Sequence, residues 1–289
     1  MLTVHLMGGL GNQLFQIFTL ISVSMKQNQS FVIPQFKPDE NRKIYKRPTY
    51  WKTILKFLLP YVVKEEKCFP YYDEGEFYYK EIPFFKNDNV KLYGYFQSYK
   101  YFEKYENEIL NLLQYDTLQK NVKSQYENYF LFGGENENKL KSEIISMHFR
   151  LGDYKGNEHA HIVLPLQYYK NSLADALKSN KNIKRVLCFG EKGDSRILYQ
   201  NIQKLKIIFP GIEFILCNFD IEDWKQLVLM SCCNHHIIAN SSFSWWGAYF
   251  NKSSQKNVYY PDKWFGPALA SKNTHDLFPP TWKKMVTFV

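Results

Sequence analysis

Several features that mark common classes of protein are missing from this sequence of 289 residues. The five cysteines form no CxxC pair and are odd in number, which favours buried thiols in a reducing compartment over disulfides. The opening stretch, MLTVHLMGGLGNQ, has neither a charged leading region nor a long apolar run, so it is not typical of a signal peptide. No apolar run approaches the length of a membrane span. We therefore expect a cytoplasmic protein.

Clusters of metal ligands are missing as well, and no DxD pattern occurs. The closest group is NFDIED (218–223), in which Glu222 and Asp223 are expected to place negative charge at the start of a helix. His235 and His236 are adjacent in an apolar run. Because successive residues of a strand point to opposite faces of a sheet, these two histidines are not expected to bind one metal together. The sequence therefore predicts that no metal is bound.

Acidic residues are the scarcer charge, because the formal net charge is +9 and the pI is near 9.0. Such a surplus favours anionic partners, namely nucleotides, nucleic acid or an acidic membrane face. No long block of Lys and Arg concentrates the charge, which argues against a nucleic-acid partner.

The residues that are abundant indicate a folded, aromatic-rich protein. Hydrophobic residues make up 45% of the chain and charged residues 22%, a balance that supports a packed core. Aromatic residues reach 18%, which suits a surface for carbohydrate or nucleobases and is equally compatible with coding bias. The length allows two modest domains or one large α/β domain.

The N-terminal segment has the pattern of a nucleotide-binding α/β unit. LTVHLM (2–7) predicts a buried strand, GGLGNQ (8–13) a glycine-rich turn and LFQIFTLISVSM (14–25) a buried helix. Leu14 stands where a GxGxxG motif needs its third glycine, so we reject a dinucleotide fingerprint. Further on, WKTILKFLLPYVVK (51–64) predicts an amphipathic helix packed on the core, with peripheral contact to a membrane surface as the alternative.

The polar segment GGENENKLKSE (133–143) predicts a linker between two halves, and after it strands and helices alternate. Strands are expected at 143–150, 183–190, 212–217, 236–240 and 257–261, and helices within 165–178, 194–209, 223–233 and 242–250. This alternation predicts a parallel sheet covered on both faces, with ligands at the carboxyl ends of its strands.

Two segments at such strand ends carry groups that can bind an anion. HFRLGDY (148–154) offers His148, Arg150 and Asp153, and a guanidinium makes bidentate contacts with phosphate oxygens. The alternative for this segment alone is a surface Arg–Asp pair beside a hydrogen-bonded histidine.

The second segment is ANSSFSWWGAYF (239–250), in which two serines stand between a strand and a helix. A serine there can cap the helix, and the same free N–H groups can hold a phosphate. We assign Trp245 and Trp246 to the core rather than to sugar stacking. Together the two segments predict a cationic clamp that stabilises a pyrophosphate leaving group without a metal.

Five segments, in the expected order over nearly the whole chain, carry a resemblance to a known family. They are MGGLGNQLFQ (7–16), GYFQSYKYFE (94–103), HFRLGDY (148–154), ANSSFSWWGAYF (239–250) and PDKWF…DLFPPTWKKM (261–285). The sequence resembles the bacterial-type α-1,2-fucosyltransferases of glycosyltransferase family 11. The resemblance implies a GT-B-like α/β fold with two Rossmann-like domains facing a cleft. An acceptor-side domain would cover residues 1–140 and a GDP-fucose-binding domain residues 141–289, with a C-terminal tail that can return to the first domain.

The function implied by this resemblance is metal-independent, inverting transfer of L-fucose from GDP-β-L-fucose to the 2-hydroxyl of a terminal β-galactoside in an oligosaccharide or glycolipid. The implied catalytic residues are Arg150, Asp153 and His148, and the implied donor-binding residues are Gly9, Asn12, Arg150, Asn240, Ser241, Ser242 and Phe243. Asp153 is the candidate base, unless it only fixes Arg150 or the loop backbone.

One departure is Leu151, which stands where the family often has a second arginine. The alternatives are a fucosyltransferase of another linkage, α-1,6 or protein O-linked, and a glycan- or nucleotide-binding module without turnover.

Overall fold

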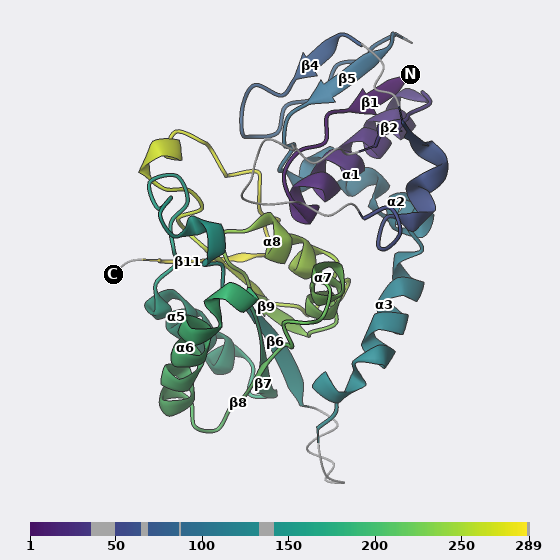
Figure 1. Ribbon diagram of the computed structural model, residues 1–289. Coiled ribbons are helices and arrows are strands. Elements are labelled where there is room, and N and C mark those ends of the chain that lie inside the picture. The colour runs from purple at the N-terminus through teal and green to yellow at the C-terminus, as the bar shows by residue number, and fades with distance from the viewer. Residues whose placement is uncertain (36–49, 65–68, 87, 133–141, 288–289) are drawn as a thin grey trace. The chain divides into compact units, whose positions relative to one another are not determined.

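The computed structural model describes residues 1–35, 50–64, 69–86, 88–132 and 142–287, and these form two compact units (Figure 1). The first unit comprises Met1–Leu118 and Lys272–Pro279, and the second comprises Gln119–Ser271 and Pro280–Val289. Most of the linker expected at 133–143 lies outside the described residues, so the domain boundary drawn there stays a prediction.

The second unit is built on a six-stranded sheet in which all neighbouring strands are parallel. Its strands are β6 (Glu143–His148), β7 (Ile183–Phe189), β8 (Glu213–Leu216), β9 (His235–Ile237), β10 (Val258–Pro261) and β11 (Lys283–Met285). The spatial order β11-β10-β9-β6-β7-β8 is the 3-2-1-4-5-6 order of a Rossmann sheet. The order reverses between β6 and β9, and ligands of such sheets bind at that point, outside the carboxyl ends of the strands.

Helices cover both faces of this sheet, as the alternation of elements predicted. They are α5 (Leu166–Ser179), α6 (Ser195–Ile208), α7 (Asp223–Ser231) and α8 (Ser242–Tyr249). The helices α5 and α6 lie on one face, and α7 and α8 on the other (Figure 1). Covered on both sides, the central strands are buried almost throughout, and β7 keeps only Lys184 exposed.

The helix α8 confirms that its tryptophans belong to the core. The side chains of Trp245 and Trp246 are fully buried, and Trp245 stacks on Tyr249 with ring centroids 4.6 Å apart. Helices α7 and α8 approach closely at Gly247, where a Cβ would lie 2.7 Å from Met230 Cβ. A buried aromatic helix therefore stands directly behind the carboxyl end of β9.

The first unit also has a parallel sheet, formed by β1 (Leu2–Val4), β5 (Val90–Tyr93) and β4 (Tyr71–Asp73) in the order β1-β5-β4. A second parallel pair joins β2 (Ile33–Pro34) to β3 (Val62–Val63). The helix α1 (Leu10–Gln27) follows β1 directly and is buried along most of its length. It packs against β1 and α2 (Glu106–Leu112), and α3 (Tyr115–Gln125) continues the chain toward the second unit.

The prediction of an amphipathic helix over residues 51–64 is wrong. The structure has only a 3-10 helix at Lys56–Tyr61, with Pro60 inside it, followed by β3. Proline lacks the N–H that an α-helix interior needs, which favours a short turn there. Within the described residues, no helix is both long and apolar enough to cross a membrane.

The cysteines of the described residues are free thiols, as expected. Cys188, Cys217 and Cys233 are buried and Cys232 is partly buried, while Cys68 lies outside the described residues. Burial raises the pKa of the Cys217 thiol to about 12 and that of Cys232 to about 11, so both stay protonated at neutral pH.

Candidate functional site

The reversal of strand order in the second unit brings the two anion-binding segments together. His148 ends β6, and Phe243 lies in the first turn of the helix that follows β9; their ring centroids are 5.7 Å apart. Tyr154, six residues beyond β6, donates a hydrogen bond from its hydroxyl to the Asn240 carbonyl over 2.8 Å. His148, Arg150 and residues 240–243 therefore lie at one sheet edge, as their positions at strand ends predicted.

Ser241 is the cap of α8. Its backbone is extended, and its Oγ accepts a hydrogen bond from the Phe243 N–H over 3.3 Å. The Ser244 hydroxyl in turn accepts from the Ala239 N–H over 3.2 Å, which ties the first turn of the helix to the strand exit. The positive end of α8 is thereby held at the switch point, where a helix N-terminus favours an anion.

Asn240 links two loops at the same edge of the sheet through hydrogen bonds of its side chain. Its side chain is buried, and its Nδ2 donates to the carbonyls of Ile162 and Trp264 over 3.0 and 3.1 Å. Its Oδ1 meets no hydrogen-bond donor among the described residues. Asn240 thus fixes two loops around the site, and its assignment to donor binding stays a prediction.

His148 is neutral at physiological pH. Burial, reinforced by the neighbouring Arg150 charge, lowers its pKa to about 3. No described residue lies within hydrogen-bond distance of its buried Nδ1. This imidazole therefore offers a hydrogen-bonding nitrogen to the site and no positive charge.

Arg150 supplies the positive charge and is held from two sides. Its Nη1 forms an ion pair with Glu191 Oε1, and its guanidinium lies over the Tyr154 ring at 5.2 Å from the centroid. His161 stacks on Tyr154 with ring centroids 4.8 Å apart and an interplanar angle of 17°. His161 therefore takes part in the stack beside Arg150.

A second pair of contacts fixes the loop after Arg150. Asp194 Oδ2 accepts the Gly152 N–H over 2.5 Å, and Asp194 Oδ1 pairs with the Lys155 ammonium. The carboxylate of Glu191 rests against Gly152, where a Cβ would lie 2.9 Å from Glu191 Cδ. Sequence reasoning missed Glu191 and Asp194 as site residues. The available signal was their position directly after the strand expected at 183–190.

The remaining residues of HFRLGDY have different places. The backbone of Asp153 lies in the 3-10 turn Gly152–Tyr154, and its side chain is outside the described part of the structure, so its role stays a prediction. Leu151 is buried in the hydrophobic core beneath the sheet edge, together with Phe149. The replacement of the family's second arginine is therefore accommodated as core packing.

Gly9 and Asn12 lie in the first unit, at the start of α1. Gly9 caps this helix without a side-chain hydrogen bond, and Gly8 has a left-handed backbone with φ of +78°. The Asn12 side chain folds over Gly8, where a Cβ would lie 2.9 Å from Asn12 Cβ. Gln97 Nε2 donates to Asn12 Oδ1 over 2.9 Å, so the amide orientation of Asn12 is set by the turn after β5.

That turn is fixed by Glu74, which follows β4. Glu74 Oε2 accepts the N–H groups of Tyr95 and Phe96 over 2.8 and 2.9 Å. Burial raises the pKa of Glu74 to about 7, although the two N–H donors act in the opposite direction. Two residues that sequence reasoning passed over, Glu74 and Gln97, therefore order the surroundings of Asn12.

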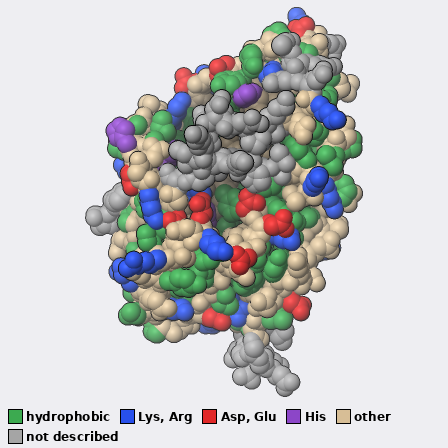
Figure 2. Space-filling view, in the orientation of Figure 1, with side chains coloured by type: hydrophobic (Ala, Val, Ile, Leu, Met, Phe, Trp, Pro, Cys, Tyr) green, Lys and Arg blue, Asp and Glu red, His purple; other side chains and the backbone are tan. Residues whose placement is uncertain are grey.

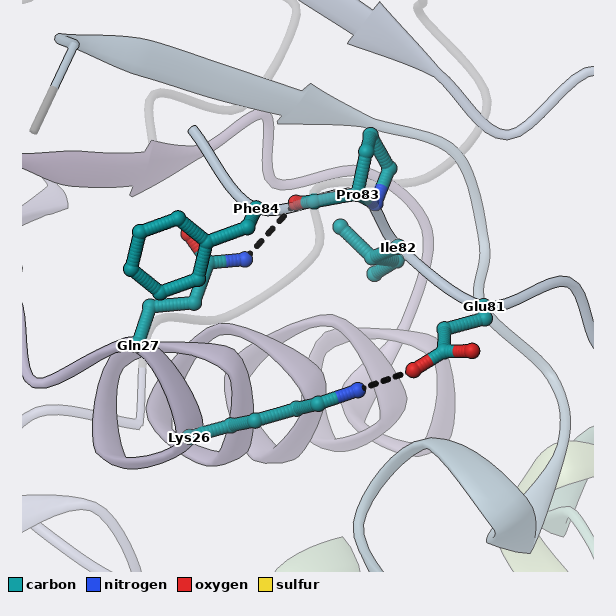
Figure 3. A pocket seen from close by; sticks show the side chains of 6 residues that line it. All are labelled: Lys26, Gln27, Glu81, Ile82, Pro83 and Phe84. Atoms are coloured by element: carbon teal, nitrogen blue, oxygen red, sulfur yellow. Dashed lines mark hydrogen bonds and ion pairs between the residues drawn. The ribbon is translucent and has the colours of Figure 1, made fainter. Parts of the chain in front are cut away.

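A cavity of about 300 Å³ lies elsewhere in the first unit (Figure 3). Its lining includes the Lys26–Glu81 ion pair at 2.6 Å, and Gln27 Nε2 donates to the Pro83 carbonyl over 2.8 Å. Lys26 and Gln27 end α1, a helix of 18 residues that begins beside Gly9. At 1.5 Å per residue the two ends are about 27 Å apart, so this cavity is separate from Gly9 and Asn12.

On the face seen in Figure 2, Lys and Arg side chains are interspersed with acidic ones rather than gathered in one block. The described residues contain no group of three or more His, Cys, Asp or Glu side chains that could hold a metal ion.

A Rossmann-type unit with an arginine and a helix N-terminus at its switch point, in a chain that also has a second parallel α/β unit, defines a nucleotide-binding α/β protein. The model of glycosyl transferase family 11 matches residues 1–284, and the chain belongs to that family. It is thus a glycosyltransferase, with a nucleotide sugar as donor and a glycan as acceptor.

Three curated proteins are similar in sequence. The "O-antigen biosynthesis glycosyltransferase WbnK" of Escherichia coli is 31% identical over 64% of this chain, a match that spans 58% of that relative. An "Alpha-1,2-colitosyltransferase" of Escherichia coli is 25% identical over 97% of both chains. A "Galactoside 2-alpha-L-fucosyltransferase" of Caenorhabditis elegans is 23% identical over 99% of this chain and 79% of that one.

The fold is similar to that of a solved glycosyltransferase. The family 9 glycosyl transferase from Veillonella parvula superposes with a TM-score of 0.50 and 11% sequence identity, over 99% of this chain and 85% of that one. This neighbour has a GT-B fold, and the parallel sheets seen here agree with it. The fold class expected from the sequence is therefore confirmed.

Proposed function

We propose that this chain is an inverting, metal-independent α-1,2-fucosyltransferase that transfers L-fucose from GDP-β-L-fucose to the 2-hydroxyl of a terminal β-galactoside. The observation that carries the proposal is the meeting of Arg150 and the capped start of α8 at the switch point of a Rossmann sheet. The names of two relatives, one an α-1,2-transferase and the other a 2-α-transferase, support the linkage.

The departing diphosphate sets the main demand on the site. Negative charge builds on the β-phosphate as the bond to the sugar breaks, and groups already fixed in place stabilise that charge best. The Arg150 guanidinium and the N–H groups that open α8 meet this demand. His148 is neutral and buried, so it can contribute a hydrogen bond, and the positive charge of the site comes from Arg150.

Inversion follows from the stereochemistry of the reactants. A β-linked donor and an α-linked product require a single displacement, with the acceptor hydroxyl attacking opposite the diphosphate. The hydroxyl proton needs an acceptor, for which Asp153 is the candidate, and the departing phosphate is the alternative. No covalent intermediate on the enzyme is required.

The donor sugar is the feature that separates the two named relatives, because one of them carries the name of a colitosyltransferase. The test is an assay of purified protein with GDP-β-L-fucose against lactose, lacto-N-biose and N-acetyllactosamine, with the linkage of the product read by NMR. We expect an α-1,2-linked fucoside on galactose. Exclusive use of GDP-colitose would replace the donor, and binding of nucleotide without turnover would favour a non-catalytic module.

A further inference from the structure

We propose that Glu191 is a positioning residue that holds the Arg150 guanidinium in the orientation that the leaving diphosphate requires. The inference rests on the function proposed above, because it concerns the arginine assigned to the donor. The established family membership assigns no role to Glu191, which stands outside the five segments that carry the family resemblance.

The two residues come from adjacent strands. Arg150 follows β6 by two residues, and Glu191 follows β7 by two residues. The strands pair in parallel, with His148 opposite Phe189, so the two exits lie side by side. Arg150 Nη1 and Glu191 Oε1 form an ion pair there, with Arg150 mostly buried and Glu191 41% exposed.

Gly152 makes room for this arrangement. A Cβ at residue 152 would lie 2.9 Å from Glu191 Cδ, closer than side chains normally pack. Gly152 is not among the residues with positive φ, so its backbone does not by itself require glycine. The Glu191 carboxylate is therefore the group that a Cβ at residue 152 would displace.

The rest of the same turn makes further contacts with the loop after β6. Asp194, three residues after Glu191 and itself buried, accepts the Gly152 N–H and pairs with Lys155. The turn after β7 therefore contacts the loop after β6 at three residues, Arg150, Gly152 and Lys155. A long, flexible arginine held in this way loses little side-chain entropy when an anion arrives, and preorganised charge is what lowers a barrier.

The chemistry predicts a split between turnover and donor binding. Glu191 carries a negative charge next to Arg150, so its removal does not weaken the attraction of the site for an anion in the ground state. Removal of Glu191 instead disturbs the orientation of the Arg150 guanidinium that the transition state needs. For Glu191→Gln we expect kcat to fall at least tenfold, while KM for the donor stays within threefold.

A double-mutant cycle tests whether Glu191 acts through Arg150. In an Arg150→Ala background, Glu191→Gln should change kcat/KM by less than twofold. Gly152→Ala, which displaces the carboxylate sterically, should lower kcat as Glu191→Gln does. The matched control is Asp175→Asn on α5, which breaks an ion pair with Lys283 of β11 and should leave kcat unchanged.

A readout that needs no donor separates this inference from the proposed function. In ¹⁵N NMR spectra of the full chain, the Arg150 side-chain Nε–H signal should be sharp in the wild type and broadened in Glu191→Gln. This holds even if GDP-fucose is not the substrate, in which case the failed fucose assay overturns only the proposed function. A sharp signal in the variant, or a Glu191→Gln loss of kcat that persists without Arg150, would overturn the positioning role. The second result would point to direct contact of Glu191 with the donor.

Discussion

Tyr154 and Asn240 are joined by a hydrogen bond of 2.8 Å from the Tyr154 hydroxyl to the Asn240 carbonyl. The two residues are 86 positions apart and lie beyond the carboxyl ends of β6 and β9, the strands between which the sheet order reverses. The same tyrosine carries Arg150 over its ring and His161 stacked against it. One aromatic side chain therefore connects the arginine to the strand exit that leads into α8.

Tyr154→Phe should lower activity while preserving the fold. The ring contacts remain, but the bond to Asn240 is lost, and a hydrogen bond of this kind contributes about 1 kcal/mol. We expect kcat/KM to fall severalfold with a small decrease in Tm. Tyr199→Phe, at an exposed position of α6, is the control. Equal activity in both variants would show that the hydrogen bond does not organise the site.

Arg150→Ala should abolish most of the transfer activity. Removing a fixed contact to a charge that develops in the transition state costs about 3 kcal/mol, or roughly a hundredfold in rate. Arg150→Lys should not restore the rate, because an ammonium lacks the planar fork with which a guanidinium can bind phosphate oxygens while it pairs with Glu191. Steady-state kinetics on folded protein, checked by circular dichroism, measure this. A folded Arg150→Ala protein within a few-fold of the wild type would remove Arg150 from the mechanism.

Transfer should continue in excess EDTA. The charge of the leaving group is assigned to Arg150 and the start of α8, so a divalent cation has no necessary part. The measurement compares initial rates of protein treated with EDTA with rates after addition of Mn²⁺ or Mg²⁺. Loss of activity that either ion restores would contradict the assignment.

Asp153→Asn distinguishes a base from a loop residue. A base role predicts that transfer is lost while GDP still binds with wild-type affinity, because the amide cannot accept the hydroxyl proton. A role in the loop predicts weaker GDP binding or a lower Tm. Calorimetry with GDP and a fucosyl-transfer assay on the same preparation separate the two. Full activity in the variant would leave the departing phosphate as the proton acceptor.

Glu74→Gln should flatten part of the dependence of stability on pH. The pKa of Glu74 is raised from 4.5 to about 7 in the folded chain, mainly by burial, with Asp73 raising it further and Lys272 lowering it. Between these values the folded state binds more protons than the unfolded state, so the free energy of unfolding decreases as pH rises through this window. Above pH 7 the ionised, buried carboxylate lowers the free energy of unfolding by about 3 kcal/mol, the amount that corresponds to this pKa shift.

The variant lacks this cost because its amide does not ionise. Urea unfolding of both proteins at pH 5, 6, 7 and 8 should show the stability difference shifting in favour of Glu74→Gln as pH rises. Glu76→Gln, at an exposed position two residues further along the chain, is the control. Parallel pH profiles for wild type and Glu74→Gln would mean that Glu74 titrates normally.

The local sequence pattern was sufficient to predict most strands and helices of the second unit. The strands and helices expected between residues 143 and 261 are all present, with ends within a few residues, because each apolar run matches one period and is bounded by polar turns. The cap at Ser241 and the burial of Trp245 and Trp246 were also readable, since both depend on residues close in the chain. The segment 51–64 was misread because its apolar spacing outweighed Pro60.

The sequence by itself determined which strand ends carry an arginine, a histidine and a pair of serines, and that such ends share one edge of a parallel sheet. Only the tertiary structure decided which side chains those groups meet. Glu191 reaches Arg150 because β7 pairs with β6, and Gln97 reaches Asn12 because β5 pairs with β1. Strand order depends on packing energy summed over a whole sheet and leaves no mark in any short segment. The partners that orient the proposed site residues therefore had to come from the fold.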